Sequence, residues 1–517
     1  MKKGLSLFAL ALVVAACGTS NKTASKKAIA DPTVYANTIT QEDLKTALYK
    51  YASDEFQGRE TGEPGQKMAV DFLKNHYIKY GVPAAKKDGN YFQDVPLEVM
   101  SPPEVTITAN NKTFTATNHI VSVGGGETGT LSAKDYVYAS YGIEDDKYSN
   151  YTNIDVKGKI VVIKDGEPKN EDGTNLISGE TGDSKWSNFR QQFALKRDIA
   201  MEKGAVAVLF HYPRVFPMAK MRFGTSSGRM SLVGKSDSMY YLLINEDFAK
   251  DLISDIDTND TPKVINTPIT LDFKKKSKSI SSENVAAYIK GSEKPDEVIV
   301  ISAHLDHEGV KNGEVYNGAD DDGSGTVAVV EIAEAFAKAV KDGNGPKRSI
   351  LFLNVTGEEK GLLGSRHYTD NDPIFPLANT VANLNIDMIG RTDPKRKEGD
   401  RNYIYLIGSD KLSTDLHNIS EAMNQKYMNV ELDYTFNKKD DPNRFYYRSD
   451  HYNFAKNNIP VIFYFNGTHD DYHQPGDTPD KIEYDLLENR TRLVFYTAWE
   501  VANRDERIVV DKTGEEE

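Results

Sequence analysis

Residues 297–340 read "EVIVISAHLDHEGVKNGEVYNGADDDGSGTVAVVEIAEAFAKAV" and decide the fold class of the chain. The apolar run at 297–303 predicts a buried strand. After a Gly-rich loop, apolar residues recur at helical spacing, with Val329, Ala333, Phe336 and Val340 along one stripe. A buried strand followed by an amphipathic helix is the repeating unit of an α/β fold.

Similar strand-like runs follow along the chain and extend this pattern. They are "RSILFLNVT" (348–356), "VANLNID" (381–387), "YIYLIGS" (403–409) and "IPVIFYF" (459–465). Apolar strands that alternate with helices favour a mixed, largely parallel sheet flanked by helices on both faces.

Polar residues gather at the ends of these strands, where ligand sites in α/β sheets usually form. They are His304, Asp306, Asp320, Asp321, Asp322, Glu358, Glu359, Asp387 and His473. Imidazoles and carboxylates together suit zinc or a similar divalent ion. Adjacent carboxylates repel one another unless cations neutralise them, so the Asp triplet favours a site for two metal ions about 3.5–4 Å apart.

The Asp triplet has a second interpretation, an EF-hand calcium loop. Asp320, Asp322, Ser324, Gly325 and Glu331 fall at ligand and turn positions of such a loop. An EF-hand needs an entering helix, however, and the preceding Gly-rich segment "HEGVKNGEVYNGA" does not predict one.

Five motifs resemble those of M28-family zinc peptidases, in the same order along the chain. They are "SAHLDH" (302–307), "NGADDDGSGT" (317–326), "TGEEKGLLGS" (356–365), "NIDMIG" (385–390) and "HQPGDT" (473–478). The resemblance covers residues from about 283 to 505 and the segment "FQGRETGEPG" (56–65). It implies a phosphorylase/hydrolase-like zinc exopeptidase fold and two Zn²⁺ per chain.

The resemblance also implies a role for each matching residue. His304 and Asp387 would bind one zinc, Glu359 and His473 the other, and Asp321 would bridge them through a segment with a cis Asp321–Asp322 peptide bond. Glu358 would be the general base, and Asp306 would orient His304. Tyr446, or its neighbour Tyr447, would stabilise the oxyanion.

Other polar residues near these motifs are expected outside the metal site. His307 stands where family members often carry a small residue, and it would point away from His304 if 304–307 continued as a strand. His451 and His469 are left out of the metal shell, with His451 a second-sphere candidate. Arg391 is expected to pair with a surface acid rather than with a substrate carboxylate.

The N-terminus predicts an export signal and a membrane anchor. "MKKGLSLFALALVVAAC" places two lysines before an apolar run and small residues before Cys17. Its last four residues resemble a bacterial lipobox, which implies cleavage after residue 16 and a lipid on Cys17. The chain would be an exported lipoprotein on the periplasmic face of the outer membrane or on the cell surface. Cys17 is the only cysteine, so no intramolecular disulfide can form.

Composition and local motifs predict several segments. Residues 18–38 are polar and small and predict a tether, and 39–111 form an N-terminal part of the peptidase domain. Residues 112–270 contain "VKGKIVVIKDG" and "KGAVAVLFHY", which resemble a β-rich protease-associated (PA) domain. The Lys-rich "LDFKKKSKSISSEN" (271–284) is expected to be a linker to the catalytic domain at 283–509.

These expectations converge on a metallopeptidase with peptide substrates, most simply an aminopeptidase. A carboxypeptidase or other amide hydrolase on the same site, and a non-catalytic binding protein on the peptidase fold, stay open as alternatives. The formal net charge of −14 argues against nucleic-acid binding, which depends on Lys and Arg. Membrane contact is expected through the lipid alone.

Overall fold

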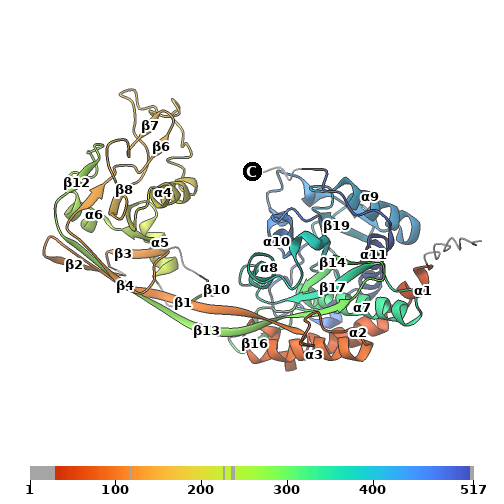
Figure 1. Ribbon diagram of the computed structural model, residues 1–517. Helices are drawn as coiled ribbons and strands as arrows, with labels where there is room; N and C mark the ends of the chain where they lie inside the picture. The colour runs from red at the N-terminus through yellow and green to blue at the C-terminus, as the bar shows by residue number, and fades with distance from the viewer. Residues whose placement is uncertain (1–29, 117, 225–227, 235–238, 513–517) are drawn as a thin grey trace, which may run out of the picture.

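The computed structural model describes residues 30–116, 118–224, 228–234 and 239–512. Cys17, the expected signal peptide and the first part of the expected tether lie outside the described residues. Figure 1 shows two lobes joined by a long ribbon of two strands. Among the described residues, none of the helices is both long and apolar enough to cross a membrane.

The larger lobe is built on a mixed sheet whose centre is parallel. The strand order is β10-β1-β13-β17-β14-β18-β21-β19-β20, in which β10 is Arg229–Leu232. The central strands are β17 (Arg348–Val355), β14 (Lys294–His304), β18 (Thr380–Ile386) and β21 (Val461–Phe465), and neighbours among them run parallel. β19 (Tyr403–Ile407) is antiparallel to β21, and β20 (Glu431–Asp433) is parallel to β19. The predicted sheet and its five strands are confirmed.

Helices cover both faces of this sheet because alternate strand residues are apolar on each side. Ile299 and Ile301 of β14 join the core under the helices on one face, whereas Val298 and Val300 join a separate core on the other. The first face carries α2 (Gln41–Tyr51), α3 (Pro64–Tyr80), α7 (Gly325–Lys341), α9 (Thr414–Met423) and α11 (Tyr484–Asn503). The second face carries the short α10 (His451–Ala455), and α8 (Leu363–Arg366) packs beside it.

The chain packs into the large lobe before the predicted end of the tether. α1 (Thr33–Ala36) places Tyr35 and Ala36 in the core, and the Tyr35 ring stacks on Trp499 with centroids 5.4 Å apart. The prediction of a tether up to residue 38 is therefore wrong for residues 33–38. Because Tyr35 and Ala36 pack into the core, this part of the backbone is held in one conformation and cannot act as a tether.

The expected linker at 271–284 is instead part of a continuous strand, so that prediction is wrong. β13 (Ile269–Ile289) pairs antiparallel with β1 (Phe92–Ala109) along almost its whole length. The ladder register shifts between Ser101 and Glu104, where Pro102 and Pro103 cannot donate backbone hydrogen bonds.

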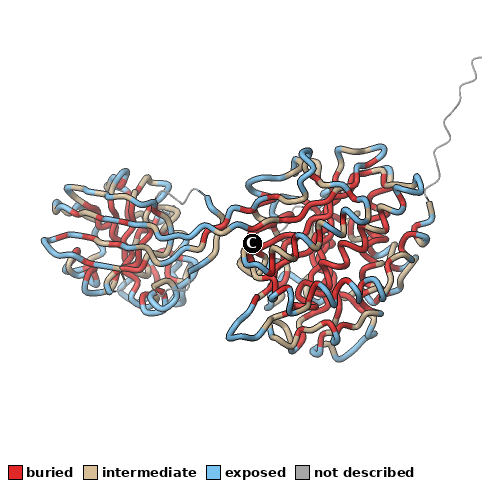
Figure 2. Tube along the Cα trace, turned by 90° about the horizontal axis from the view of Figure 1, so that it is seen from below, coloured by how far each residue is buried: buried red, intermediate tan, exposed pale blue. Residues whose placement is uncertain are grey.

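Cross-strand ion pairs explain how a Lys-rich segment forms a strand. Lys275 lies 2.9 Å from Glu98, and Lys276 lies 2.7 Å from Glu104, both on β1. Opposite charges on facing strands stabilise a ladder. Figure 2 shows the buried residues gathered in two separate bodies, with the ribbon between them largely exposed.

The smaller lobe is a second mixed sheet with the order β12-β5-β8-β9-β11-β3. Its strands are β3 (Ile120–Gly124), β5 (Tyr136–Tyr138), β8 (Ile160–Lys164), β9 (Ala207–His211), β11 (Tyr240–Ile244) and β12 (Lys263–Ile265). One face packs against α4 (Gln191–Glu202) and α5 (Phe216–Phe223). The other packs against α6 (Glu246–Leu252) and the ribbon ends, including Val105 and Phe273. The core of this lobe thus extends beyond the predicted 112–270 at both ends.

Candidate metal centre

The carboxyl ends of three parallel strands place most of the predicted site residues at one edge of the sheet. His304 is the last residue of β14, Glu358 and Glu359 follow β17, and Asp387 follows β18. His473 lies in the loop after β21. The convergence that the strand pattern predicted is confirmed by these positions.

The Asp triplet lies in the turn that begins α7, and its three carboxylates point to different partners. Asp320 accepts hydrogen bonds from the Gly390 N–H at 2.7 Å and the Ser324 hydroxyl at 3.0 Å. Asp322 accepts from the backbone N–H groups of His304 and Met388, each at 3.1 Å. Only the middle residue, Asp321, faces the other site residues. The peptide bond between Asp321 and Asp322 is cis, as the resemblance implied.

The calcium-loop interpretation of the triplet is wrong. Asp322 is occupied by backbone N–H groups of the loops after β14 and β18. Glu331 lies inside α7 and accepts a hydrogen bond from the Tyr80 hydroxyl at 3.3 Å. The spacing matched a calcium loop, but the helix carries Glu331 away from the Asp triplet.

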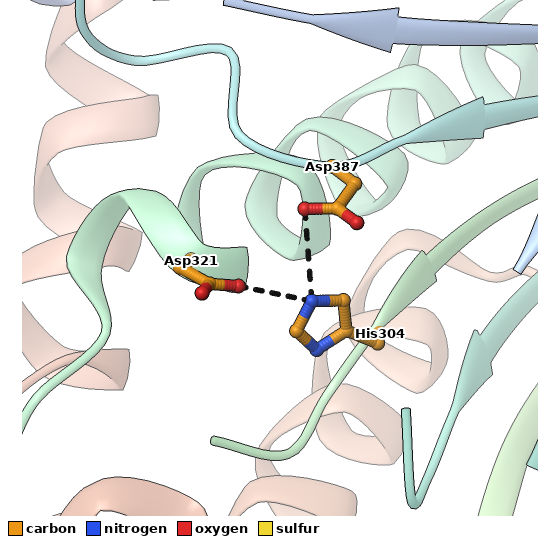
Figure 3. A group of neighbouring side chains, drawn as sticks. All are labelled: His304, Asp321 and Asp387. Carbon is orange, nitrogen blue, oxygen red and sulfur yellow. Dashed lines mark ion pairs between the residues drawn. The ribbon is translucent and has the colours of Figure 1, made fainter. Parts of the chain in front are cut away.

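Asp321 is the centre of the site, because its two carboxylate oxygens face two different groups of donors. Oδ1 lies 3.1 Å from His304 Nε2, and Asp387 Oδ1 lies 3.7 Å from the same nitrogen. Figure 3 shows these three side chains pointing toward one another. Oδ2 lies 3.0 Å from His473 Nε2, which lies 3.2 Å from Glu359 Oε2.

The hydrogen bonding of these side chains fits metal ions. Asp321 Oδ2 and Glu359 Oε1 are buried and accept no hydrogen bond from the described residues. Buried polar atoms are rarely left without partners, and orphaned atoms call for an explanation such as an ion. Imidazole nitrogens and carboxylate oxygens that converge within 4.8 Å of one another form a donor set that suits zinc. The described residues therefore fit the metal that their chemistry implies.

The electrostatics of the site couple these groups strongly. Burial alone would raise the pKa of Asp321, but the imidazoles of His304 and His473 beside its oxygens hold it well below its usual value. Burial works against the charged form of His473, yet Asp321 and Glu359 raise its pKa to about 10. Metal ions would replace these protons as the counter-charges of the carboxylates.

Glu358 lies at the edge of the cavity without joining either donor group. The cavity is lined by His304, Asp321, Glu358, Asp387, His473 and a set of largely apolar and aromatic residues, Met388, Phe445, Phe463, Phe465 and Tyr472. Burial raises the pKa of Glu358 well above its usual value, and the carboxylates of Glu359, Asp387 and Asp450 raise it further. A carboxyl group with a raised pKa can hold and release a proton near neutral pH.

Asp306 contacts His304 differently from the expected arrangement. Its backbone carbonyl, not its carboxylate, lies 3.0 Å from His304 Nδ1, while the carboxylate Oδ1 is 4.0 Å away. The carboxylate accepts hydrogen bonds from the Thr61 hydroxyl at 2.7 Å and the Glu358 N–H at 3.1 Å. Asp306 thus links the loops after β14 and β17.

The N-terminal segment 56–65 also supports these loops. The guanidinium of Arg59 is fully buried and donates to the carbonyls of Leu305, Asn317 and Gly318 at 3.2, 2.6 and 2.8 Å. One arginine therefore fixes both the "HLDH" loop and the start of the Asp-rich turn.

The expectation that His307 points away from the site is wrong. β14 ends at His304, so the alternation of a strand does not continue to His307. The buried ring of His307 places Nδ1 2.9 Å from Glu359 Oε1 and 3.9 Å from Asp321 Oδ2. The signal that sequence reasoning missed is the Gly-rich segment after His307, which favours a loop over a strand.

Tyr446 does not reach the cavity that holds the donors, so its position does not support the expected oxyanion role. Its ring packs against His451, with centroids 5.7 Å apart, and both Tyr446 and Tyr447 line a different cavity. Tyr472 lines the site instead and stacks on His473, with centroids 3.9 Å apart. Tyr472 directly precedes the predicted ligand His473 in the sequence, and this position could have indicated that it lines the site.

The remaining polar residues lie outside the two donor groups, as predicted. His451 is buried and stacks on Phe463 with centroids 4.7 Å apart. His469 Nε2 lies 3.2 Å from Asp320 Oδ2. Arg391 Nη2 lies 3.2 Å from Asp471 Oδ2, which is an ion pair with an acidic residue, as expected.

Comparisons with known proteins agree with this site. Residues 284–498 match the family model described as Peptidase family M28. A 105-residue segment is 35% identical to probable glutamate carboxypeptidase LAMP1 of Arabidopsis thaliana and covers 20% of this chain and 14% of that protein. A 149-residue segment is 30% identical to aminopeptidase YwaD of Bacillus subtilis (strain 168) and covers 26% of this chain and 30% of that protein. The matches thus span less than a third of the length of these curated relatives.

One solved structure resembles the chain over most of its length. The aminopeptidase from Aneurinibacillus sp. strain AM-1 is 19% identical, has a TM-score of 0.47, and the match covers 93% of this chain and 98% of that one. Residues 284–498 thus match Peptidase family M28, and the candidate metal-binding clusters of His, Asp and Glu lie in this segment.

Proposed function

We propose that this chain is an extracytoplasmic dizinc peptidase that removes N-terminal residues from peptides. The observation that carries the proposal is the position of Asp321, whose two oxygens face His304 on one side and His473 on the other. One carboxylate between two donor groups supports a bridge between two ions. His304 and Asp387 would hold one zinc, and His473 and Glu359 the other.

The zinc ions, when bound, would polarise the scissile carbonyl and lower the pKa of a water molecule between them. Glu358 would take the proton from that water and pass it to the leaving amine, as general base and then general acid. Its backbone N–H is fixed by the Asp306 carboxylate, so the side chain starts from a defined position. The aromatic lining of the cavity keeps bulk water away and suits an apolar substrate side chain.

A specific residue favours a second candidate, a carboxypeptidase. Arg448 lines the same cavity and lies 3.5 Å from the Tyr472 hydroxyl through Nη2. A guanidinium is the usual partner of a substrate carboxylate. Against this, every other charged group that lines the cavity is an acid or a histidine, which suits a free amine. One of the curated relatives named above is called an aminopeptidase and the other a carboxypeptidase, so the names favour neither.

Blocked peptides distinguish the two candidates. We expect a tripeptide with a free N-terminus and an amidated C-terminus to be cleaved, and its N-acetylated form with a free C-terminus to resist cleavage. Pre-treatment with a chelator should abolish this cleavage, and zinc should restore it. The reverse preference would establish the carboxypeptidase, and chelator-insensitive cleavage would overturn the metallopeptidase proposal.

The proposed location outside the cytoplasm rests on "LSLFALALVVAAC" and Cys17. Lipid on Cys17 would anchor the chain at the periplasmic face of the outer membrane or at the cell surface. Expressed in a bacterium, the wild-type chain should sediment with membranes and incorporate labelled fatty acid, whereas Cys17→Ser should do neither. Equal membrane association of both forms would contradict the lipid anchor.

The smaller lobe is proposed to act as a PA-like module that shields the cavity or selects substrates. Its support is the pair of motifs at 156–166 and 203–212, which form the parallel strands β8 and β9 of its sheet.

A further inference from the structure

His307 has the surroundings of a metal ligand rather than of a structural histidine. Its ring is fully buried, and neither ring nitrogen has a hydrogen-bond partner among the described residues. Burying a polar group without a partner costs free energy. Other buried histidines, such as His367, share this state, so the feature that distinguishes His307 is the pair of carboxylates that face its Nδ1.

The atoms that face His307 Nδ1 lack partners as well. Glu359 Oε1 lies 2.9 Å away and Asp321 Oδ2 lies 3.9 Å away, and neither accepts a hydrogen bond from the described residues. A single shared proton could satisfy one of these contacts but not both oxygens. A cation between the three atoms would satisfy all of them.

The spacing of the three atoms fits one ion. Two neighbouring ligands on a four- or five-coordinate zinc with bonds of about 2.0–2.2 Å lie roughly 2.8–3.6 Å apart. The distances from His307 Nδ1 to Glu359 and Asp321, 2.9 and 3.9 Å, lie within this range and slightly above it. The corresponding distances from His473 Nε2 are 3.2 and 3.0 Å. The His307 and His473 imidazoles thus lie at similar distances from the carboxylates of Glu359 and Asp321.

The chain holds the His307 ring in place through features that a mobile side chain would not need. Gly318 has a φ of +53°, and a Cβ there would come within 2.5 Å of the Cγ and Cδ2 atoms of His307. The backbone N–H of His307 donates to the carbonyl of Arg59 at 3.3 Å. The same Cβ at 318 would lie still closer to the Asp321 carbonyl oxygen, so glycine at 318 leaves room for both the Asp-rich turn and the imidazole beside it.

We infer that His307 is a fourth protein ligand of the second metal ion, together with Asp321, Glu359 and His473. This inference rests on the proposed dizinc function. It makes the two sites unequal, because the first offers one imidazole, from His304, and the second offers two. Imidazole ligands favour zinc and its neighbours over magnesium or calcium. The second site is then the tighter one and fills first.

Anomalous diffraction of zinc-loaded crystals tests the ligand directly. The inference requires a zinc peak about 2.0–2.3 Å from His307 Nδ1, in the range of zinc–nitrogen bonds. A peak held by Asp321, Glu359 and His473 but more than about 3 Å from Nδ1 would exceed any such bond and would overturn the inference. This measurement uses the wild-type chain and does not depend on the folding of a variant.

A titration with a chromophoric chelator tests the consequence for affinity. His307→Asn keeps an amide that can donate a hydrogen bond to Glu359 but removes the imidazole. We expect the tighter of the two zinc dissociation constants to rise at least tenfold, in line with the 10–100-fold effects known even for outer-sphere partners. The weaker constant should change less than the tighter one, because His307 faces Glu359 and Asp321 of the second donor group and no ligand of the first but Asp321.

His367→Asn is the matched control. His367 is also buried with both ring nitrogens unpartnered, but it lies beside α8 and is absent from both donor groups. Its substitution should leave both zinc constants unchanged, and circular dichroism should confirm that both variants fold.

The outcomes separate this inference from the proposed function. Two zincs per wild-type chain with peptide hydrolysis, but an unchanged tight constant in His307→Asn, would overturn the role of His307 alone. A wild-type chain that takes up no zinc would overturn the dizinc proposal and the role of His307 with it.

Discussion

The backbone N–H of Glu358 donates a 3.1 Å hydrogen bond to the carboxylate of Asp306. This contact joins the loop after β14 to the loop after β17, and so fixes Glu358 relative to His304. Because the contact uses the backbone of Glu358, its side chain can be changed without breaking it.

Glu358→Gln is expected to keep the metals and lose turnover. The amide cannot accept the proton, so the rate of peptide hydrolysis should fall about 10²–10⁴-fold. Plasma emission analysis should still find two zincs per chain, since Glu358 belongs to neither donor group. A variant that hydrolyses peptides at nearly the wild-type rate would exclude Glu358 as the base.

Asp321→Asn is expected to reduce zinc content from two ions to at most one. The amide keeps the size of the side chain but offers one neutral oxygen where the two donor groups need a shared, charged carboxylate. Metal analysis after gel filtration measures the loss. Asp320→Asn is the control: its Oδ1 accepts hydrogen bonds from Gly390 and Ser324, and an amide oxygen can do the same. Equal zinc content in the two variants would argue against the bridging role.

Zinc should also raise the thermal stability of the wild-type chain. A ligand that binds only the folded state adds about 2.7 kcal/mol when present at 100 times its dissociation constant. Chelation should therefore lower the melting temperature, and Asp321→Asn should show a smaller drop than the wild type.

Glu331→Gln is expected to stabilise the protein at pH 8 and not at pH 5. Burial raises the pKa of Glu331 to about 8, and the carboxylates of Glu334 and Asp43 add to the shift from 4.5. Between pH 5 and pH 8 the Glu331 carboxyl has lost its proton in the unfolded chain but keeps it in the folded chain. Stability therefore falls as pH rises through this window, by on the order of 1 kcal/mol per pH unit.

The glutamine removes this titration and can still accept the hydrogen bond from Tyr80. Melting temperatures at pH 5 and pH 8 measure the difference between variant and wild type. The exposed Glu42→Gln on α2 should show no such pH-dependent gain. A gain for Glu331→Gln at both pH values alike would contradict the buried, protonated carboxyl.

Removal of the smaller lobe is expected to leave a folded catalytic lobe. Met100 of β1 lies directly opposite Ser277 of β13, so an Asn-Gly turn that joins them closes a two-residue hairpin. The variant should hydrolyse a short chromogenic substrate and differ from the full chain in its preference among longer peptides. Identical preferences would remove the proposed role of this lobe in selecting substrates.

The parts of this structure that could be predicted from sequence are those where a single signal dominates. β14, β17 and β21 each contain an unbroken apolar run, at 298–301, 350–353 and 461–465, and such runs are typical of buried parallel strands. The positions of the polar residues that follow such strands are set by the strands, as Asp387 follows β18. The convergence of His304, Asp321 and Asp387 could be predicted because it needed only the strand ends and the turn that begins α7.

The ribbon and His307 could not be predicted because both depend on partners distant in sequence. The Lys-rich part of β13 is stable as a strand only because Glu98 and Glu104 face it from β1. His307 turns toward Glu359 because β14 ends early and the N-terminal loop pairs with it, through a bridge between Glu60 and His307. Tyr446 was misplaced for a related reason: the loop that carries it packs on His451, away from the donors.

The buried Arg59 shows that the segment matched by the family is not a complete folding unit. The segment matched by the family begins at residue 284, yet the arginine that ties two of its loops together comes from more than 200 positions upstream. A gene trimmed to the matched segment would also lack α2 and α3, and would expose the apolar surface that they cover. Cloning should therefore start before Thr33, where α1 begins, and not at the border of the recognised domain.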